Sequence, residues 1–400
     1  MNAGWIIAII LFMIAVWLPL DFALGRKKHR AALKRKDYPI RMSDIDIFTH
    51  GKTLFSSYFG ELKNAKHHIH VLFYIVKEDD ISEEFLSILE EKAKAGVEVR
   101  LLLDWLGSWS VKKKTVKRIE AAGIKFAFCH KPQFPFVFYT FQTRNHRKIT
   151  IIDGKVGFLG GYNVGKEYID QDPKLTPWRD YHLKITGEAV QDIQHEFLTD
   201  WQKCAKVDLF NLKTFFPALE KGSIRHQILP TEGFELETTF SGLISKAEKS
   251  ITIGSPYFIP SKKVMAELMR ALHRGVEIQI IVPAVADHIL VREASFPYFR
   301  KLLREGATVY QYMKGFYHAK VLIIDDYVCD IGTANFDKRS FFLNHEINCF
   351  IYDFNTIQKV KDIIAKDILD SQKLTLKHLN KPNLLRSIKE AFSRLFLLYL

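Results

Sequence analysis

The middle of the chain alternates between continuous apolar stretches and stretches in which apolar and charged residues are mixed. This order occurs twice: a strand-like run, a helix-like run, a glycine and a second strand-like run. The runs are HIHVLFYIV, SEEFLSILEEKAKAG and VEVRLLL in the first copy, and SKAEKSITIGSPYFIP, SKKVMAELMRALHRG and VEIQIIV in the second. The glycines, Gly96 and Gly275, fit the C-terminal end of each helix. Strands alternating with helices of this length predict an α/β fold, with parallel or mixed sheets covered by helices.

The repeat becomes sharper around two short motifs. Each copy reads H-x-K-x4-D, with the same spacing from the aspartate to a later glycine and from that glycine to an asparagine. Two chance matches in the same register are very rare, so the motif predicts duplicated halves that share one site. The matching residues are His146, Lys148, Asp153, Gly160 and Asn163 in the first copy, and His318, Lys320, Asp325, Gly332 and Asn335 in the second.

The spacing within each motif indicates which side chains act together. In a strand, residues i and i+2 face the same side, so the histidine and lysine of each copy project together. Asp153 and Asp325 lie an odd number of residues from both and would face the other way. They are kept in the candidate catalytic set, but each is expected to shape the site or the strand end rather than contact substrate.

A pseudo-twofold arrangement of the copies brings two histidines, two lysines and two asparagines into one pocket. The lysines neutralise a phosphate, and the amides of Asn163 and Asn335 donate to its oxygens. One histidine can attack phosphorus while the other protonates the leaving oxygen. This chemistry predicts phosphoryl transfer with a bell-shaped pH profile. It requires no metal and no cofactor, because the lysines supply the positive charge.

The N-terminus predicts a membrane anchor. The run from Gly4 to Leu20 carries no charge, and continuing it to Leu24 gives a length sufficient to span a bilayer at about 1.5 Å per residue. A cleavable signal peptide fits less well, because no basic residue precedes the run. Eight Lys/Arg against one acid follow between Arg26 and Arg41. The positive-inside rule then places this basic segment, and the body after it, in the cytoplasm.

The C-terminus predicts an amphipathic helix. From Leu384 to Arg394 the apolar and polar positions form two separate arcs, with Arg and Lys on the polar side. The helix either docks on the protein's own core or contacts a membrane surface. Six Lys/Arg against one acid lie between Lys373 and Leu400, so most of the net charge of +13 belongs to the two ends. That distribution favours an anionic membrane as partner over nucleic acid.

These patterns divide the chain into five segments. The expected segments are a transmembrane anchor over 1–25, a basic linker over 26–45, a first domain over 46–215, a second domain over 216–372, and a basic amphipathic segment over 373–400.

The four cysteines match no metal-binding spacing and are expected to be free thiols in a reducing compartment.

The duplicated motif resembles that of the phospholipase D superfamily, and the whole chain is similar to the bacterial cardiolipin synthases of that superfamily. The stretches that carry the resemblance are 145–148, 160–163, 178–182, 332–337, 339–341 and 344–346. The resemblance implies two similar phospholipase D-like α/β/α sandwich domains related by a pseudo-twofold, plus one N-terminal transmembrane helix. It also implies a single-pass protein of the cell membrane, whose catalytic body faces the cytoplasm.

The resemblance further implies a two-step phosphatidyl transfer on anionic phospholipid. A histidine attacks one phosphatidylglycerol and releases glycerol, and the hydroxyl of a second phosphatidylglycerol then attacks to give cardiolipin. By analogy His146 is the nucleophile and His318 the acid and then the base, although the sequence leaves the reverse assignment open. Asp180 and Glu346 are each assigned to orienting an active-site histidine. The alternatives are a phospholipase D-type hydrolase and transfer to a different alcohol. The oligomeric state is not indicated.

An aromatic segment from Phe134 to Phe141 precedes the first motif. It contains five aromatic residues around Pro135. Two interpretations remain open for it: a buried strand leading to the motif, or an apolar rim where acyl chains enter.

Overall fold

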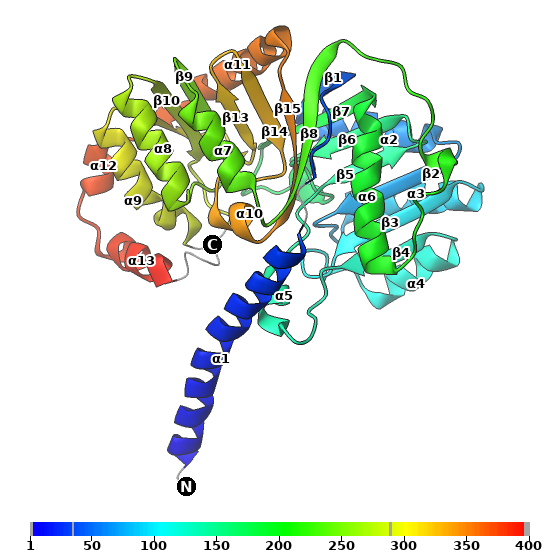
Figure 1. The fold of residues 1–400 in the computed structure, drawn as a ribbon, viewed down its shortest axis with the longest axis horizontal. Helices are drawn as coiled ribbons and strands as arrows, with labels where there is room; N and C mark the ends of the chain where they lie inside the picture. Colours follow the sequence, from blue (N-terminus) through cyan, green and yellow to red (C-terminus); the bar gives the residue numbers. More distant parts are fainter. Residues whose placement is uncertain (1–2, 34–35, 288–289, 396–400) are drawn as a thin grey trace.

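The computed structural model describes residues 3–33, 36–287 and 290–395, in two halves that each hold one copy of the repeat (Figure 1). The elements of the first half are α1 (Ala3–Ala32), β1 (Arg41–His50), α2 (Gly51–Asn64), β2 (His68–Phe73), α3 (Asp80–Lys94), β3 (Glu98–Asp104), α4 (Lys113–Ala121), β4 (Lys125–Cys129), α5 (Val137–Gln142), β5 (Ile149–Ile152), β6 (Val156–Gly160), η1 (Lys166–Ile169), β7 (Trp178–Gly187), α6 (Ala189–Ala205) and η2 (Lys213–Phe215). Those of the second half are β8 (Ile224–Glu232), α7 (Leu236–Ser245), β9 (Ser250–Gly254), α8 (Lys262–His273), β10 (Glu277–Pro283), α9 (Val291–Arg304), β11 (Thr308–Tyr312), β12 (Phe316–Tyr317), β13 (Val321–Ile324), β14 (Val328–Gly332), α10 (Lys338–Phe342), β15 (His345–Ile351), α11 (Phe354–Leu369), β16 (Ser371–Lys373), α12 (Leu376–Asn380) and α13 (Leu384–Leu395).

The described strands form one 16-stranded mixed sheet that runs through both halves. Their order is β16-β11-β10-β9-β13-β14-β15-β8-β1-β7-β6-β5-β2-β3-β4, with β12 paired to β7 outside this path. Apart from β16 and β12, the order is symmetrical about its centre. Each strand of the first half has its counterpart of the second half at the same distance from that centre. The centre of this symmetry is the antiparallel pair β1–β8, where Ser43 lies opposite Ile224. The α/β fold with two similar domains is therefore confirmed.

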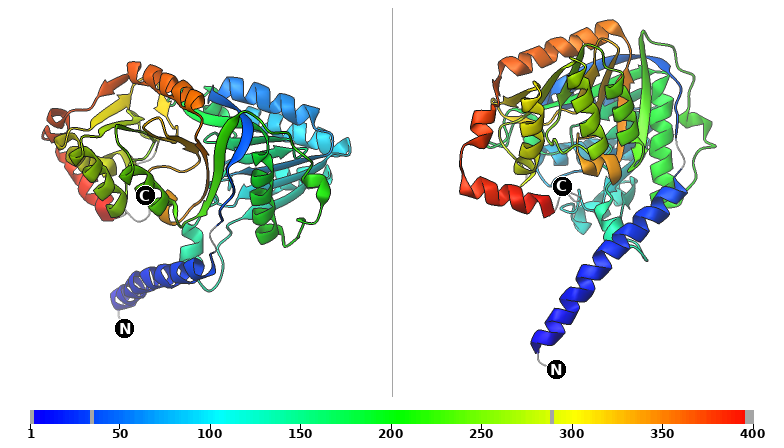
Figure 2. Two further views of the ribbon diagram at one scale, coloured as in Figure 1. Left: turned by 45° about the horizontal axis from the view of Figure 1, so that its top comes forward. Right: turned by 60° about the vertical axis from the view of Figure 1, so that its left-hand side comes forward.

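Helices cover the sheet on both faces (Figure 2). In β2, Ile69, Val71 and Phe73 pack in one core with α2 and α3, whereas Leu72 packs in a second core with α6. Burial on both faces explains why the strand-like runs are continuously apolar rather than alternating. The second core also holds residues of α11 and joins the two halves.

The repeated helices begin and end as the sequence predicts. The side chain of Asp79 accepts a hydrogen bond from Ser82 N at the start of α3, and Ser261 caps α8 in the same way through Val264 N. Gly96 follows α3 with a φ of 89°, and Gly275 follows α8 with a φ of 86°. Glycine is favoured at both points because this left-handed conformation is strained for other residues. The four cysteines are free thiols.

The N-terminal segment is helical for longer than expected. The segment 26–45, predicted to be a linker, continues α1 to Ala32 and already contains the start of β1 at Arg41. The C-terminal part of α1 packs on the protein, since Phe22 contacts Tyr139 of α5 and the Asp21 carboxylate accepts from Tyr139 N at 2.7 Å. Within the described residues, no helix combines the length and the apolar character that crossing a membrane requires.

The aromatic segment before the first motif is not a strand. It forms the short helix α5 against α1, and Phe134 just before it is 92% exposed. The interpretation of 134–141 as a buried strand is therefore wrong. Pro135 interrupts the segment before the helix begins, and the aromatic side chains on one side of α5 pack on α1.

Candidate active site

The two motifs lie in extended segments that precede strands β5 and β13. His146 and Lys148 come before Ile149, where β5 begins, and His318 and Lys320 come before Val321, where β13 begins. The motif residues are therefore outside the regular strands in which they were expected. Both histidine side chains are almost buried, with 10% of His146 and 8% of His318 exposed. A small part of each side chain remains accessible to a ligand.

Each histidine pairs with a carboxylate from the other half of the chain. Nδ1 of His146 lies 2.9 and 3.1 Å from the two carboxylate oxygens of Glu346. Nδ1 of His318 lies 2.5 Å from Oδ2 of Asp180. A carboxylate on Nδ1 fixes the tautomer in which Nε2 carries a lone pair for a substrate. This exchange of partners brings the two copies of the motif into one site.

Both carboxylates are fully buried and held by further contacts. Glu346 accepts from the hydroxyls of Thr333 at 2.6 Å and Ser340 at 2.8 Å. Asp180 accepts from Tyr181 N at 2.8 Å, and it packs so closely on Gly161 that a Cβ there would lie 2.1 Å from Oδ1. The position that corresponds to Gly161 in the second copy is Thr333. The two halves therefore hold their acids by different means.

The two lysines share this electrostatic environment. Burial, with a smaller contribution from the charge of Lys320, lowers the pKa of Lys148 to about 7, and burial lowers that of Lys320 to about 8. Each ammonium group donates to the backbone carbonyl of the histidine in its own motif. The charges of Glu346 and Asp180 act on both lysines and oppose the lowering. Two buried cations next to two histidines form a site suited to a phosphate.

Burial lowers the pKa of both histidines. For His146, Glu346 partly opposes the lowering. For His318, burial together with the charge of Lys320 lowers the pKa to about 4. Burial raises the pKa of both acids, but Lys320 and His318 beside Asp180, and His146 and Lys148 beside Glu346, outweigh it and hold both pKa values below the usual range. Each imidazole thus faces an ionised carboxylate.

Asp153 and Asp325 do not join this cluster, although both were included in the candidate catalytic set. Each sits in the turn after its strand, with φ of 54° and 53°. The Asp153 carboxylate accepts from the backbone N–H groups of residues 66–68, and that of Asp325 accepts from residues 248–250. Both aspartates therefore anchor the start of a neighbouring strand, β2 or β9.

The two asparagines are buried but differ in their contacts. Oδ1 of Asn163 accepts from Ile75 N at 3.1 Å, and its Nδ2 donates to the Tyr168 hydroxyl at 3.1 Å. Asn335 is held through its backbone N–H, which donates to Ser340 Oγ at 3.0 Å. Its Oδ1 is buried without a hydrogen-bond partner among the described residues. Asn163 thus already uses both ends of its amide within the protein.

Sequence reasoning missed two aromatic side chains at the site. The Tyr74 ring lies 5.0 Å from the His146 ring and 5.3 Å from the Lys148 ammonium, and the Trp178 ring lies 4.8 Å from the His318 ring. Trp178 opens a stretch that carries the resemblance, whereas no pattern singled out Tyr74. These rings limit the positions that each imidazole can take.

A comparison with known families decides the assignment of the chain. A family model described as "Cardiolipin synthase, PLD-like domain" matches residues 58–201 and 241–368, which together are more than half of the chain. The chain belongs to the cardiolipin synthase family. Homologues of this family are enzymes of the phospholipase D superfamily, in agreement with the duplicated motif.

Individual relatives agree with this assignment. The minor cardiolipin synthase ClsB of Bacillus subtilis (strain 168) is 39% identical over 381 residues, which cover 95% of this chain and 95% of that protein. The major cardiolipin synthase ClsA of the same strain is 38% identical over 360 residues, covering 88% of this chain and 74% of ClsA. The crystal structure of a phosphatidylserine synthase from Haemophilus influenzae Rd KW20 has the same fold, with a TM-score of 0.72 and 17% identity over 94% of this chain and 100% of that chain.

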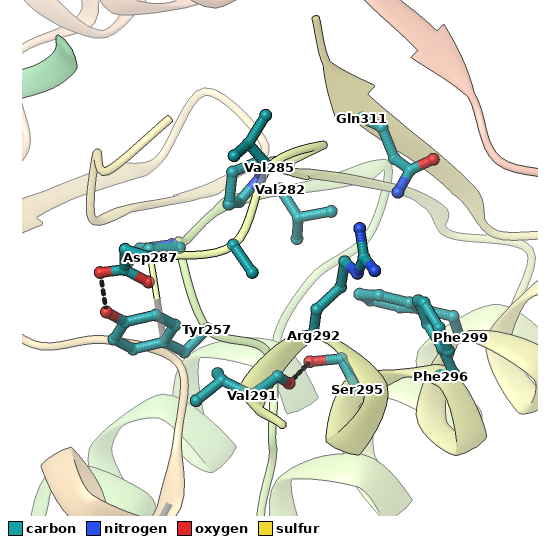
Figure 3. A pocket seen from close by; sticks show the side chains of 13 residues that line it. Tyr257, Val282, Val285, Asp287, Val291, Arg292, Ser295, Phe296, Phe299 and Gln311 are labelled. Atoms are coloured by element: carbon teal, nitrogen blue, oxygen red, sulfur yellow. Dashed lines mark hydrogen bonds between the residues drawn. The ribbon is translucent and has the colours of Figure 1, made fainter. Parts of the chain in front are cut away.

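A mostly apolar cavity borders the site in this member of the cardiolipin synthase family. Figure 3 shows its lining by Val282, Val291 and Phe296 around a volume of about 370 Å³ that includes its opening. The Asp287 carboxylate at its wall accepts from the Tyr257 hydroxyl at 2.5 Å. The same carboxylate opposes the lowering of the pKa of His318, so the cavity lies close to the second motif.

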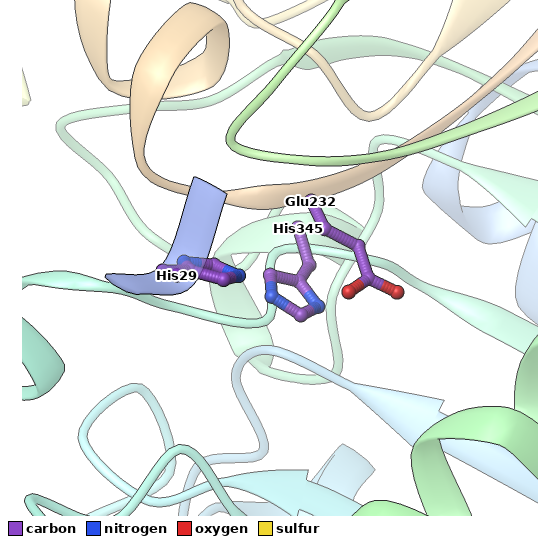
Figure 4. Close-up of side chains that lie close together, drawn as sticks. All are labelled: His29, Glu232 and His345. Atoms are coloured by element: carbon purple, nitrogen blue, oxygen red, sulfur yellow. The ribbon is translucent and has the colours of Figure 1, made fainter. Parts of the chain in front are cut away.

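Among the described residues, one group could supply three ligands to a metal ion: His29, Glu232 and His345 (Figure 4). His345 is next to Glu346 in β15, but neighbouring residues of a strand face opposite sides. Its ring therefore stacks on His29 rather than joining the catalytic histidines. The Glu232 carboxylate already has three cations near it, at 2.6, 3.7 and 3.9 Å. A metal ion would compete with all three, so this geometry does not favour one.

Proposed function

We propose that this chain makes cardiolipin and glycerol from two molecules of phosphatidylglycerol through a phosphatidyl-histidine intermediate. The observation that carries the proposal is the exchange of acids between the halves, which sets His146–Glu346 and His318–Asp180 around two buried lysines. The membership in the cardiolipin synthase family supports the choice of product.

In the first step, Nε2 of one histidine attacks phosphorus. A P–N bond forms, the P–O bond to glycerol breaks, and the other histidine gives its proton to the leaving oxygen. In the second step, the headgroup hydroxyl of another phosphatidylglycerol attacks the same phosphorus. The second histidine takes up that hydroxyl's proton, and the P–N bond breaks. We assign the attack to His146 and the proton transfers to His318.

The acid needs a proton that the empty site does not hold, because burial and Lys320 lower the pKa of His318 to about 4. An anionic phosphodiester raises the pKa of an imidazole beside it. In this proposal the proton is taken up when the phosphate binds. Asp180 then stabilises the imidazolium that results.

We also propose that the chain is anchored in the cell membrane by α1, with the catalytic body on the cytoplasmic side. The support comes from the uncharged sequence from Gly4 to Leu20 and the basic run that follows it. Most of the apolar side chains of α1 that the structure describes before Asp21 are exposed, including Phe12 at 70% and Leu20 at 53%. Phe134, just before α5, is 92% exposed, as a side chain of an entry rim for acyl chains would be.

The test uses the full chain reconstituted in vesicles with phosphatidylglycerol labelled at its phosphorus. Labelled cardiolipin with release of glycerol supports the proposal, whereas phosphatidic acid alone indicates a hydrolase. A label that becomes attached to the protein, stable to alkali and released by acid, identifies the phosphoramidate of the intermediate. H146A should prevent this attachment, and H318A should slow its formation; attachment in H146A but not in H318A reverses the assignment.

A further inference from the structure

Helix α13 is amphipathic, and its polar side faces the protein. The Glu390 carboxylate, 7% exposed, accepts from Nη1 and Nη2 of Arg300 in α9 at 2.6 and 2.8 Å. Arg300 Nη2 also donates to the carbonyl of Leu379 in α12. Ser393, one turn after Glu390, is buried as well. This bidentate ion pair therefore fixes how α13 is rotated about its own axis against the second half.

The apolar side of the helix points away from the protein. Leu384 is 78% exposed, Leu385 72%, Ile388 56% and Phe392 51%. At about 100° per residue these four side chains span an arc of about 100°, on the side opposite to Glu390 and Ser393. A surface helix of a soluble protein normally has the reverse orientation, with its apolar stripe in the core. The sequence left docking on the protein or contact with a membrane open, and the structure shows docking through the polar side.

The charges around this apolar face are positive. Lys381 and Lys389 are exposed near it. The groove between α13 and the body is lined by Arg292, Arg386 and Lys389, and its one acidic lining residue, Glu293, is already paired with Arg292. An apolar stripe flanked by basic residues is typical of a helix that lies in the surface of an anionic bilayer.

The position of α13 agrees with such a surface. In Figure 1 and in the right-hand view of Figure 2, α13 and α1 lie at the same end of the molecule, and α11 lies at the opposite end. Helix α5, which packs on α1, lies at this lower end in Figure 1. Helices α1, α5 and α13 are thus gathered at one end of the molecule, where one plane can meet them.

We propose that α13 is a second membrane contact, which lies in the plane of an anionic lipid surface. Leu384, Leu385, Ile388 and Phe392 insert among the acyl chains, and Lys381 and Lys389 bind the headgroup phosphates. Because α1 belongs to the first half and α13 to the second, the two contacts together fix the orientation of the shared site above the bilayer. The inference rests on the proposed function for the choice of anionic lipid and for the membrane contact of α1.

The experiment places an environment-sensitive fluorophore on α13 of the full chain. The protein carries C204S, since the other three cysteines are buried, and a single label at I388C. It is reconstituted in phosphatidylcholine vesicles with and without phosphatidylglycerol, and nitroxide-labelled acyl chains serve as quenchers. The matched control is L369C, at a side chain that is 85% exposed at the end of α11, and α11 is the helix at the opposite end of the molecule.

We expect the label at 388 to shift to the blue and to be quenched when phosphatidylglycerol is present, and the label at 369 to do neither. K381Q/K389Q should reduce the docked fraction, with about a fivefold loss in the docking equilibrium for each lysine removed. K359Q/K366Q, two exposed lysines of α11, should leave it unchanged.

Equal behaviour of the two labels overturns the proposal. A label at 388 that is shielded from lipid quenchers but self-quenches between copies also overturns it, and indicates a second chain as the partner. The quenching involves no turnover, so an enzyme that makes cardiolipin without quenching at 388 refutes this inference while leaving the proposed function intact.

Discussion

Glu346 of the second half holds His146 of the first through contacts of 2.9 and 3.1 Å between Nδ1 and both carboxylate oxygens. They are 200 positions apart in the sequence, and the contact joins the two domains. Neither half can form a working histidine alone, because the orienting acid of each comes from the other. The pairing ties the chemistry to the assembly of the whole sheet.

Replacing either acid by its amide should impair catalysis far more than folding. In E346Q the amide keeps the shape of the side chain but loses the charge that orients His146 and opposes the lowering of its pKa. We expect kcat to fall by roughly 100-fold or more, as for other orienting carboxylates. The acid limb of the pH profile should move to lower pH, because removing Glu346 lowers the pKa of His146 further. D180N should likewise lower the pKa of His318, and because His318 acts as the acid, it is the alkaline limb that this change moves to lower pH.

The matched control for these variants is D330N. Asp330 is equally buried, and burial raises its pKa to about 8, so it is already protonated at neutral pH. Its substitution should leave turnover within a factor of about two. Similar losses in D330N and E346Q would mean that general damage to the core, and not orientation of the histidine, explains the effect.

Gly161→Ala should weaken the second pair specifically. The added Cβ would lie 2.1 Å from Oδ1 of Asp180, so the carboxylate must move away from His318. We expect kcat to fall at least about tenfold, which corresponds to a rise of about 1.4 kcal/mol in the activation free energy. G60A and G242A are the controls, since both glycines lie in helices with open space around the added methyl group. Unchanged turnover in G161A would show that Asp180 does not orient His318.

Asp153→Ala and Asp325→Ala should reduce stability and leave the chemistry intact. Each substitution leaves three backbone N–H groups without their carboxylate, at sites partly open to water. We expect the free energy of unfolding to fall by about 1–3 kcal/mol. Denaturation of the detergent-solubilised protein measures this, and the rate per folded molecule should stay the same. Lost turnover at full stability would return these aspartates to the catalytic set.

The alkaline side of the pH profile should report the lysines. In the empty enzyme the pKa of Lys148 is about 7 and that of Lys320 about 8, so both lose their charge as the pH rises through this window. Since kcat/KM reports the free enzyme, it should decline more steeply above about pH 7, where the loss of the lysine charges adds to the decline that His318 causes above its pKa of about 4. Bound phosphate raises the pKa of both lysines, so the alkaline limb of kcat should lie at higher pH. In K148R the alkaline limb of the kcat/KM profile should move to higher pH, because the guanidinium keeps its proton. If the limb does not move, the titration belongs to another group.

The sequence by itself determined the α/β class, the duplication and the histidine–lysine pairs. The reason is that these features are local: a buried strand needs a continuous apolar run, a helix end favours Gly96 or Gly275, and a motif repeated in register implies a repeated structure. The identity of the four central side chains could therefore be read from spacing alone. The same local signals failed for the segment 134–141, whose aromatic content fits a strand as well as a helix packed on α1.

Only the tertiary structure decided which groups meet across the chain. The sequence assigned Asp180 and Glu346 to orienting roles, but the exchange of acids depends on how the halves pair along β1 and β8, which no short-range pattern encodes. The tertiary structure also decided which face of α13 meets the protein. An amphipathic pattern shows that a helix has two faces, whereas the ion pair of Glu390 with Arg300 determines that the polar face meets the protein. That choice comes from a contact between residues 90 positions apart, and it leaves the four apolar side chains exposed.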